Sequence, residues 1–267
     1  MNVYDQTKKW PHVSFLSITT VALVASALLF AVSIGCKSSS TEPSNSGSIS
    51  MTTQYSAAHS PSDMFDAQLP LRAVTGSAAI DSITISRARF VLRDIKYKTL
   101  SDSAMFRADP FVLELILSSA VQEFSVAGVP FGSYRRIEFD VHRINVNDVT
   151  PLPASEQGQF VDFLAGERYS IIVSGTTYTG GVPTAFTFRS RVNVKQKIDL
   201  APELVVNDPA PAINAAMLVS SGGWFVASGG GLLDPADALN EIAITDNMRE
   251  SIKVFKDNNK DGSKDAN

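Results

Sequence analysis

The sequence predicts a mainly β protein, an antiparallel immunoglobulin-like or transthyretin-like β-sandwich with a short C-terminal helical segment. From Leu69 onward, apolar and polar residues alternate with a period of two, as they do in strands with one buried and one solvated face. These segments recur about every ten to twenty residues with turn residues between them, which favours two packed sheets over a parallel α/β sheet. Cys36 is the only cysteine. A mature chain that begins there has no disulfide and depends on a packed core.

Residues 1–35 are predicted to be a cleaved leader, because a positively charged start precedes an apolar run from Val21 to Ile34. The segment Ser33-Ile34-Gly35-Cys36 resembles the lipobox of bacterial lipoproteins, in which the cysteine thiol takes a diacylglycerol before the leader is removed. The resemblance implies that Cys36 is the lipid attachment site. It also implies a lipid-anchored protein of the cell envelope, sorted to the outer membrane.

Two alternatives for this region remain open. Val13 to Ile34 approaches the roughly 20 apolar residues that span a bilayer, so the segment could be an uncleaved anchor. Cys36 could also be an ordinary thiol. The lipoprotein interpretation is preferred because it accounts for the cysteine and the leader together, and several acyl chains, palmitate among them, would hold the protein firmly.

Residues 36–61 are predicted to be a flexible tether, because Lys37 to Pro61 is rich in Ser, Thr, Asn, Gly and Pro and lacks apolar periodicity. The formal net charge is −4, and removal of a leader with two lysines and one aspartate would make it −5. This mildly acidic balance argues against nucleic acid as a partner.

Residues 62–210 are predicted to be the β-sandwich. Its first strand extends from Ile80 to Leu92 and continues from Ile95 to Tyr97. Later segments with strand patterns are Phe111–Leu117, Val121–Val126, Arg135–Ile144, Glu167–Gly175, Thr184–Lys195 and Lys197–Val206. The turn Thr179-Gly180-Gly181-Val182-Pro183 predicts a hairpin between the segments around Ile171 and Phe186.

A second turn, Val129-Pro130-Phe131-Gly132-Ser133-Tyr134, directly precedes a strongly alternating segment. We expect Tyr134 to pack its ring into a corner of the sandwich while its hydroxyl reaches the backbone. With Ile83 to Leu92, this region resembles secreted or lipid-anchored Gram-negative proteins that carry a β-sandwich domain without an established activity. Similar turns occur in transthyretin-like and carboxypeptidase-regulatory-like sandwiches. The resemblance covers Ile80 to Val206 and transfers no catalytic residue.

Residues 211–256 are predicted to be a further strand, Ala212 to Ser220, and short helices packed on the sandwich. One helix is expected to begin with Asp234 as its N-cap and a second to extend from Asn247 to Phe255. Trp224 lies among glycines and is a weak candidate for a ligand-stacking platform. The alternative, which is favoured, is that it is a buried packing residue.

The Asp- and Asn-rich residues 257–267 carry the sharpest chemical signal. Oxygen-bearing residues at alternating positions before Gly262 are typical of loops that bind Ca²⁺. The candidate ligands are Asp257, Asn259, Asp261, Ser263 and Asp265. The glutamate that completes an EF-hand loop has no counterpart before Asn267, and the alternative is a solvated polar tail.

The sequence contains no motif for catalysis, and the chain is therefore predicted not to be an enzyme. The preferred hypothesis is a non-catalytic binding, adhesion or assembly module with a protein or glycan ligand. The alternative is an extracellular or periplasmic hydrolase that uses dispersed carboxylates such as Glu138 and Asp140. The basic residues on the first strand are expected to line a solvated face; they are Arg87, Arg89, Arg93, Lys96 and Lys98.

Overall fold

The computed structural model describes residues 45–57, 80–100, 103–107 and 109–265, which all belong to one compact unit, Pro43–Asn267. The predicted leader (residues 1–35) and residues 36–44 and 58–61 of the predicted tether, Cys36 among them, lie outside the described residues. None of the helices in the described ranges has both the length and the apolar character needed to cross a membrane.

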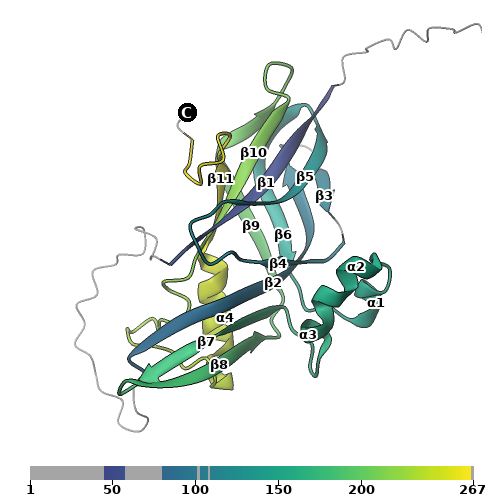
Figure 1. Ribbon diagram of the computed structural model, residues 1–267. Coiled ribbons are helices and arrows are strands. Elements are labelled where there is room, and N and C mark those ends of the chain that lie inside the picture. The colour runs from purple at the N-terminus through teal and green to yellow at the C-terminus, as the bar shows by residue number, and fades with distance from the viewer. Residues whose placement is uncertain (1–44, 58–79, 101–102, 108, 266–267) are drawn as a thin grey trace, which may run out of the picture. The chain divides into compact units, whose positions relative to one another are not determined.

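The fold is mainly β, and its two sheets confirm the predicted β-sandwich (Figure 1). The first sheet has four strands in the order β11 (Ile252–Lys256), β10 (Ala212–Ser220), β1 (Ser46–Ser56) and β5 (Gln122–Pro130). The second follows the order β8 (Val182–Ser190), β7 (Ile171–Thr179), β2 (Ser82–Lys98), β6 (Gly132–Val141) and β9 (Val194–Val206). Two further strands, β3 (Ser103–Arg107) and β4 (Phe111–Glu114), pair with β2. All pairs are antiparallel except β1 with β10, which is parallel.

The long strand β2 joins two halves of the second sheet. Its first half pairs with β7 and its second half with β6, and Val91 lies between them. The Val91 N–H donates to the carbonyl of Ser170 at 2.9 Å, and its carbonyl accepts from the N–H of His142 at 3.0 Å. The chain between His142 and Ser170 therefore leaves the sheet at this point as a helical insert.

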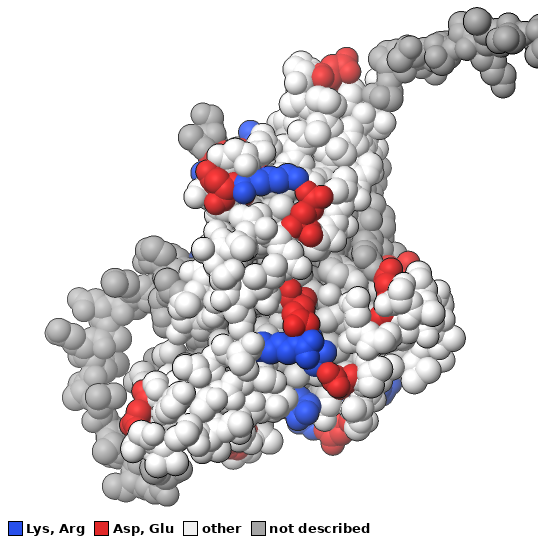
Figure 2. Space-filling model, in the orientation of Figure 1, with Lys and Arg blue, Asp and Glu red and all other residues white. Residues whose placement is uncertain are grey.

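The helical insert comprises α1 (Val146–Val149), α2 (Ala154–Gln157), the 3-10 helix η2 (Gly158–Phe160) and α3 (Val161–Leu164). It packs on Val91 and Ile172 of the second sheet through its own small apolar cluster, which is Ile144, Val149, Leu152, Phe160 and Phe163. Near it, Arg87 pairs with Glu114 at 2.7 Å and Arg89 with Asp162 at 2.6 Å. On the face shown in Figure 2, basic and acidic residues lie side by side in such small mixed groups, separated by uncharged surface.

The main core lies between the inner faces of the two sheets, where apolar residues at every second position are buried. Ile49 and Met51 of β1 are fully buried, as are Ile137 and Phe139 of β6. The helix α4 (Glu241–Glu250) lies beside the strands and adds Ile244 and Met248 to this core (Figure 1).

The prediction of a tether is wrong for Ser46–Ser56, because this segment is the interior strand β1. Ile49 and Met51 are its only large aliphatic side chains, and apart from Tyr55 the other residues are Gly, Ser, Thr and Gln, so the segment resembles a polar linker in composition. Its hydrogen-bond partners β5 and β10 are distant in sequence, and they make it a strand.

The predicted C-terminal helices are displaced. No helix begins at Asp234, whose side chain instead accepts from the N–H of Ala236 in a turn. The 3-10 helix η3 (Ala238–Asn240) and α4 follow, with Asp237 as the cap of η3. The predicted helix from Asn247 to Phe255 is wrong beyond Glu250, because Ile252–Lys256 alternates as β11 along β10.

Both predicted turns are confirmed. Tyr134 is buried, and its hydroxyl donates to the carbonyl of Pro130 at 2.7 Å. The β7–β8 hairpin closes on Gly180 and Gly181, with Thr179 opposite Val182. The two glycines have φ angles of +57° and +80°, which a two-residue hairpin turn of this kind requires.

Candidate binding groove

Strand β8 has one open edge, because it pairs only with β7 within the described ranges. Thr179 and Val182 close a two-residue hairpin, so hydrogen-bonded pairs with β7 fall on every second residue after Val182. The intervening residues, Pro183, Ala185, Thr187 and Arg189, direct their backbone groups away from β7. Proline fits this position because an outward-facing residue needs no ladder N–H.

A groove of about 280 Å³ lies along the second half of β8. Thr187, Phe188 and Arg189 form its wall on the strand. The remaining walls come from the loop before β7, from Arg191, and from the turn leading into α4; these residues are Glu167, Tyr169, Arg191, Pro235, Ala236, Asp237, Ala238 and Glu241. The open backbone of β8 therefore borders a depression with both polar and apolar walls.

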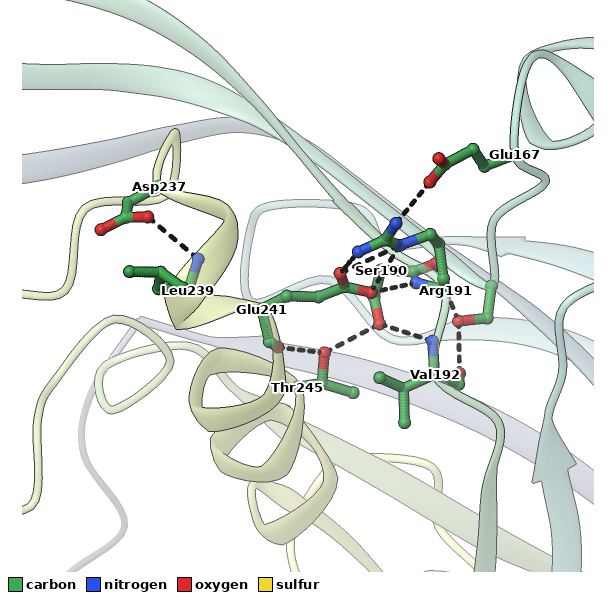
Figure 3. Close-up of polar contacts among 9 residues, drawn as sticks. Glu167, Ser190, Arg191, Val192, Asp237, Leu239, Glu241 and Thr245 are labelled. Carbon is green, nitrogen blue, oxygen red and sulfur yellow. Dashed lines mark hydrogen bonds and ion pairs between the residues drawn. The ribbon is translucent and has the colours of Figure 1, made fainter.

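An ion-pair cluster centred on Arg191 fixes the shape of this groove (Figure 3). Arg191 Nη2 lies 2.5 Å from Glu241 Oε2, and the backbone N–H of Arg191 donates to Glu241 Oε1 at 2.6 Å. Arg191 Nη1 pairs with Glu167 on the opposite side. One guanidinium thus connects the loop before β7 to the first turn of α4.

Buried hydroxyl groups continue this cluster toward the core (Figure 3). Thr245 Oγ1 lies 2.7 Å from the carbonyl of Glu241 and 2.8 Å from Ser190 Oγ. Ser190 Oγ also accepts from the N–H of Val192 at 3.1 Å, and Ser170 Oγ donates to the carbonyl of Val192 at 2.7 Å. The partners of both serine hydroxyls are backbone groups and a threonine, so neither serine has a base that would make it a nucleophile.

The charges of the cluster stabilise one another. Burial by itself raises the pKa of the Glu241 carboxyl, but the hydrogen bonds from the Arg191 side chain and backbone outweigh it and hold that pKa below its usual range. The same contacts raise the pKa of Arg191. The Glu241 carboxylate and the Arg191 guanidinium therefore remain charged at neutral pH and form a fixed wall of the groove.

Arg189 differs from Arg191, since it makes no ion pair with any residue the structure describes. Its guanidinium lies over the ring of Tyr169, 5.6 Å from the ring centroid. Two apolar side chains lie beyond the other wall: Leu239 is 89% exposed and Ile242 is 67% exposed. The groove thus combines an open strand edge with an exposed cation, and the exposed Leu239 and Ile242 follow its lining residues in the chain without lining it.

None of the residues predicted as site residues lines this groove. Cys36 lies outside the described residues. Trp224 is fully buried, with its Nε1 donating to Ser251 Oγ at 2.8 Å and its ring 5.9 Å from that of Phe90. It offers no face to a ligand, which contradicts its interpretation as a platform and agrees with the packing alternative.

The predicted cation loop is folded onto the first sheet. Asp257 is fully buried and its carboxylate accepts from the N–H groups of Asp261 at 3.1 Å and Gly262 at 2.9 Å. The Asp265 carboxylate accepts from the N–H of Asn258 at 2.9 Å. Residues 257–265 therefore form a closed loop held by the buried Asp257 carboxylate. Asn258–Asp261, Ser263 and Lys264 are solvent-exposed, as the alternative of a solvated tail expected.

The oxygens of this loop are engaged by its own donors. Asn259 Nδ2 donates to Asp261 Oδ2, and the N–H of Ser263 donates to Asp261 Oδ1, both at 2.7 Å. Within the described ranges, no group of three or more His, Cys, Asp or Glu side chains is placed to hold a metal ion. The Ca²⁺ site stays a prediction, and thermal unfolding with Ca²⁺ and with a chelator tests it.

Glu138 and Asp140 do not face each other across a cleft. They project from the same face of β6, opposite Lys96 and Arg93 of β2, and neither lines the groove. This placement gives the hydrolase alternative no support. Nearby, burial lowers the pKa of His142, and the charge of Arg93 lowers it further.

Sequence reasoning missed the two residues that shape the groove. Arg191 follows a strand and Glu241 begins a helix, and no local pattern marks either as part of a site. They are 50 positions apart in the chain and meet only through the fold. The Gly180-Gly181 turn was the one available signal, because it identified β8 as half of a hairpin.

Comparisons with known proteins identify no relative of this chain. The chain matches no protein-family model, and no curated protein or solved structure is similar enough to count as a match.

Proposed function

We propose that this chain is a lipid-anchored protein of the cell envelope whose β-sandwich is a non-catalytic binding module, and that it holds an extended segment of a partner protein along β8. The open edge of β8 is the observation that carries the binding function. An extended peptide can add a strand to such an edge, with main-chain hydrogen bonds providing affinity and neighbouring pockets providing specificity.

The surroundings of β8 suit a peptide. Ala185, Thr187 and Arg189 each present one outward N–H and one outward carbonyl. Side chains of an added strand would alternate between the groove and solvent. Arg189 would favour an acidic residue of the peptide, while Leu239 and Ile242 offer apolar contacts beside the groove.

The charged groups around the groove favour binding over catalysis. A general acid or base needs a pKa near the working pH, whereas the pKa of Glu241 is lowered and that of Arg191 is raised. Both groups are also fixed by mutual contacts, which leaves a rigid wall on which a ligand can dock.

The envelope location is supported by the sequence around Cys36. Its fatty acyl groups would anchor the chain, and β1 begins only ten positions later, at Ser46. The body would therefore remain close to the membrane that carries it.

Displayed libraries of random linear peptides, panned against the mature protein, test the binding function. The selected peptides should bind the Thr187→Pro variant at least about tenfold more weakly than they bind the wild-type protein. Proline removes one outward N–H and adds bulk at the strand edge. A Thr187→Val variant keeps the N–H and should bind normally. Equal binding by the proline variant, with its fold intact by circular dichroism, would remove β8 as the docking strand.

Intact mass and membrane fractionation of the full-length protein test the anchor. We expect a mature mass that begins at Cys36 and includes acyl chains, and its loss in Cys36→Ala. An unprocessed mass in both proteins would instead support the uncleaved anchor.

A further inference from the structure

The outer face of the second half of β6 carries charged residues at alternate positions. Ile137, Phe139 and Val141 point inward and are buried, so the alternate residues Arg136, Glu138 and Asp140 point to the other face of the sheet, where Glu138 is only 8% exposed. Their neighbours on β2 and β9 are charged as well. The register gives three rows across the sheet, Arg93–Asp140–Lys195, Lys96–Glu138–Lys197 and Lys98–Arg136–Asp199, which we call the charged array.

The charged array has an excess of positive charge. Six of its nine residues are cationic and three are anionic, a formal charge of +3 in a chain whose total is −4. The adjacent bulges of β2 and β6 add Asp94 and Arg135, which cancel each other. This face therefore carries a net positive charge although the chain as a whole is negatively charged.

The arginines and the lysines of the array differ in their ion pairs with described residues. Arg136 pairs with Asp199 at 2.6 Å and Arg93 with Asp94 at 3.3 Å. In contrast, Lys96, Lys98, Lys195 and Lys197 make no ion pair with any residue in the described part of the chain. Lys195 and Lys197 on β9 are also solvent-exposed, so two ammonium groups are available to an external anion.

The chain enters the sandwich near one end of this face. Ser46, the first residue of β1, lies opposite Pro130, just before β6 begins at Gly132. The rows at Arg136, Glu138 and Asp140 follow at about 13 to 26 Å along β6, given a rise of about 3.3 Å per residue. Ten residues from Cys36 to Ser46 can span at most about 35 Å. This length allows the array to reach the membrane surface and prevents the body from moving far from it.

We infer that the charged array docks the sandwich onto anionic phospholipid headgroups of the membrane that carries the anchor. This inference rests on the proposed lipid attachment at Cys36. Each lysine near an anionic surface favours association by a factor of about five, so a face with two exposed, unpaired lysines biases an already anchored body toward lying on the bilayer. Docking by this face would fix the orientation in which β8 is presented.

Lysine acetylation of the full-length acylated protein in vesicles, read by mass spectrometry, tests this inference. Vesicles of phosphatidylethanolamine and phosphatidylglycerol are compared with vesicles of phosphatidylcholine. Lys195 and Lys197 are expected to react about threefold or more slowly in the anionic vesicles at low salt. This protection should disappear in about 0.5 M NaCl, where charges are screened over a few ångströms.

Two controls separate the face from the anchor. Lys253 and Lys264, exposed residues outside the array, should react equally in both kinds of vesicle. In the Lys195→Gln/Lys197→Gln variant, the slower reaction of Lys96 in anionic vesicles should be lost, whereas a Lys253→Gln/Lys264→Gln variant should retain it.

The outcomes are distinguishable. Protein that floats with both kinds of vesicle but shows equal reactivity of Lys195 and Lys197 overturns the docking inference and leaves the anchor intact. Protein that floats with neither overturns the anchor and the inference together. Protection by soluble dextran sulfate in phosphatidylcholine vesicles, without protection by anionic lipid, would assign the array to an acidic glycan and reject the lipid surface.

Discussion

Two polar clusters attach the C-terminal segment to earlier strands, and they do so in different ways. At the first sheet, the Asn214 side chain of β10 accepts a hydrogen bond from Ser50 at 2.8 Å and donates one to the carbonyl of Asp257 at 2.9 Å. Asn214 and Asp257 are both buried. At the second sheet, Arg191 and Glu241 form an ion pair in which the Arg191 side chain is 41% exposed. One cluster is sealed in the protein, while the other lines a groove.

This difference separates structural from functional polar groups. The Asn214 cluster closes the C-terminal loop over the sheet formed by β1 and β10, where every polar atom needs a partner. The Arg191 cluster lies where β8 has no further strand, so its charges remain accessible. We expect substitutions in the first cluster to reduce stability strongly and substitutions in the second to affect binding more than stability.

The largest effect is expected for Asp257→Ala. The variant removes the carboxylate that accepts two backbone N–H groups and opens the C-terminal loop, which should reduce the free energy of unfolding by about 2–4 kcal/mol. Urea unfolding measures this change. Asp265→Ala removes a single bond to Asn258 and should cost about 1 kcal/mol. Equal losses in both variants would show that Asp257 does not hold the loop.

Gly262→Ala should have the next largest effect, about 1–2 kcal/mol in the free energy of unfolding. Gly262 has a φ angle of +82°, and an added Cβ would lie 2.3 Å from the side-chain oxygen of Gln54. Gly229→Ala is the matched control, because its Cβ would meet no atom and its φ angle is not positive. A stable Gly262→Ala protein would mean that the loop does not hold this conformation in solution.

Glu241→Gln should reduce the free energy of unfolding by only about 1 kcal/mol at pH 7, because the partner guanidinium is partly solvated. The pKa of Glu241 is lowered in the folded state, so its contribution is present above the unfolded value of about 4.3 and is lost as pH falls through the folded pKa. Wild type and variant should therefore converge in acid. A difference that persists or grows at low pH would contradict the ion pair.

Leu239→Ser should have the smallest effect on stability. Its side chain is 89% exposed, so the melting temperature should stay within about 1 °C of the wild-type value. Peptides selected for the groove should nevertheless bind less tightly, since an apolar contact beside it is lost. A lower melting temperature together with unchanged binding would place Leu239 in the fold and remove it from the site.

The sequence predicted the second sheet better than the first. Gly180-Gly181 defines the β7–β8 hairpin locally, and Tyr134 follows a turn that is visible in six residues. Strand β1 has no such signal, because its parallel partner β10 begins more than 150 positions later. Periodicity also could not separate α4 from β11, which follow each other after a single residue, Ser251.

The groove could not be predicted for a related reason. Whether a strand lies at an edge depends on the order of all strands in the sheet. After β8 the chain continues to β9, which pairs with β6 at the other end of the sheet and leaves β8 with β7 as its neighbour. Arg191 and Glu241 then meet across 50 positions. The Asp257 loop was visible in the sequence as a motif, whereas its burial against β10 depended on the position of Asn214.

Amide hydrogen exchange on β8, resolved by NMR, tests the open edge most directly. The amides of Thr184, Phe186 and Phe188 should exchange slowly in the free protein because they bond to β7, and those of Ala185, Thr187 and Arg189 should exchange fast. A selected peptide should slow the second set by about tenfold or more and leave the first set unchanged. Slow exchange of Ala185, Thr187 and Arg189 in the free protein, or no slowing by a bound peptide, would contradict the account.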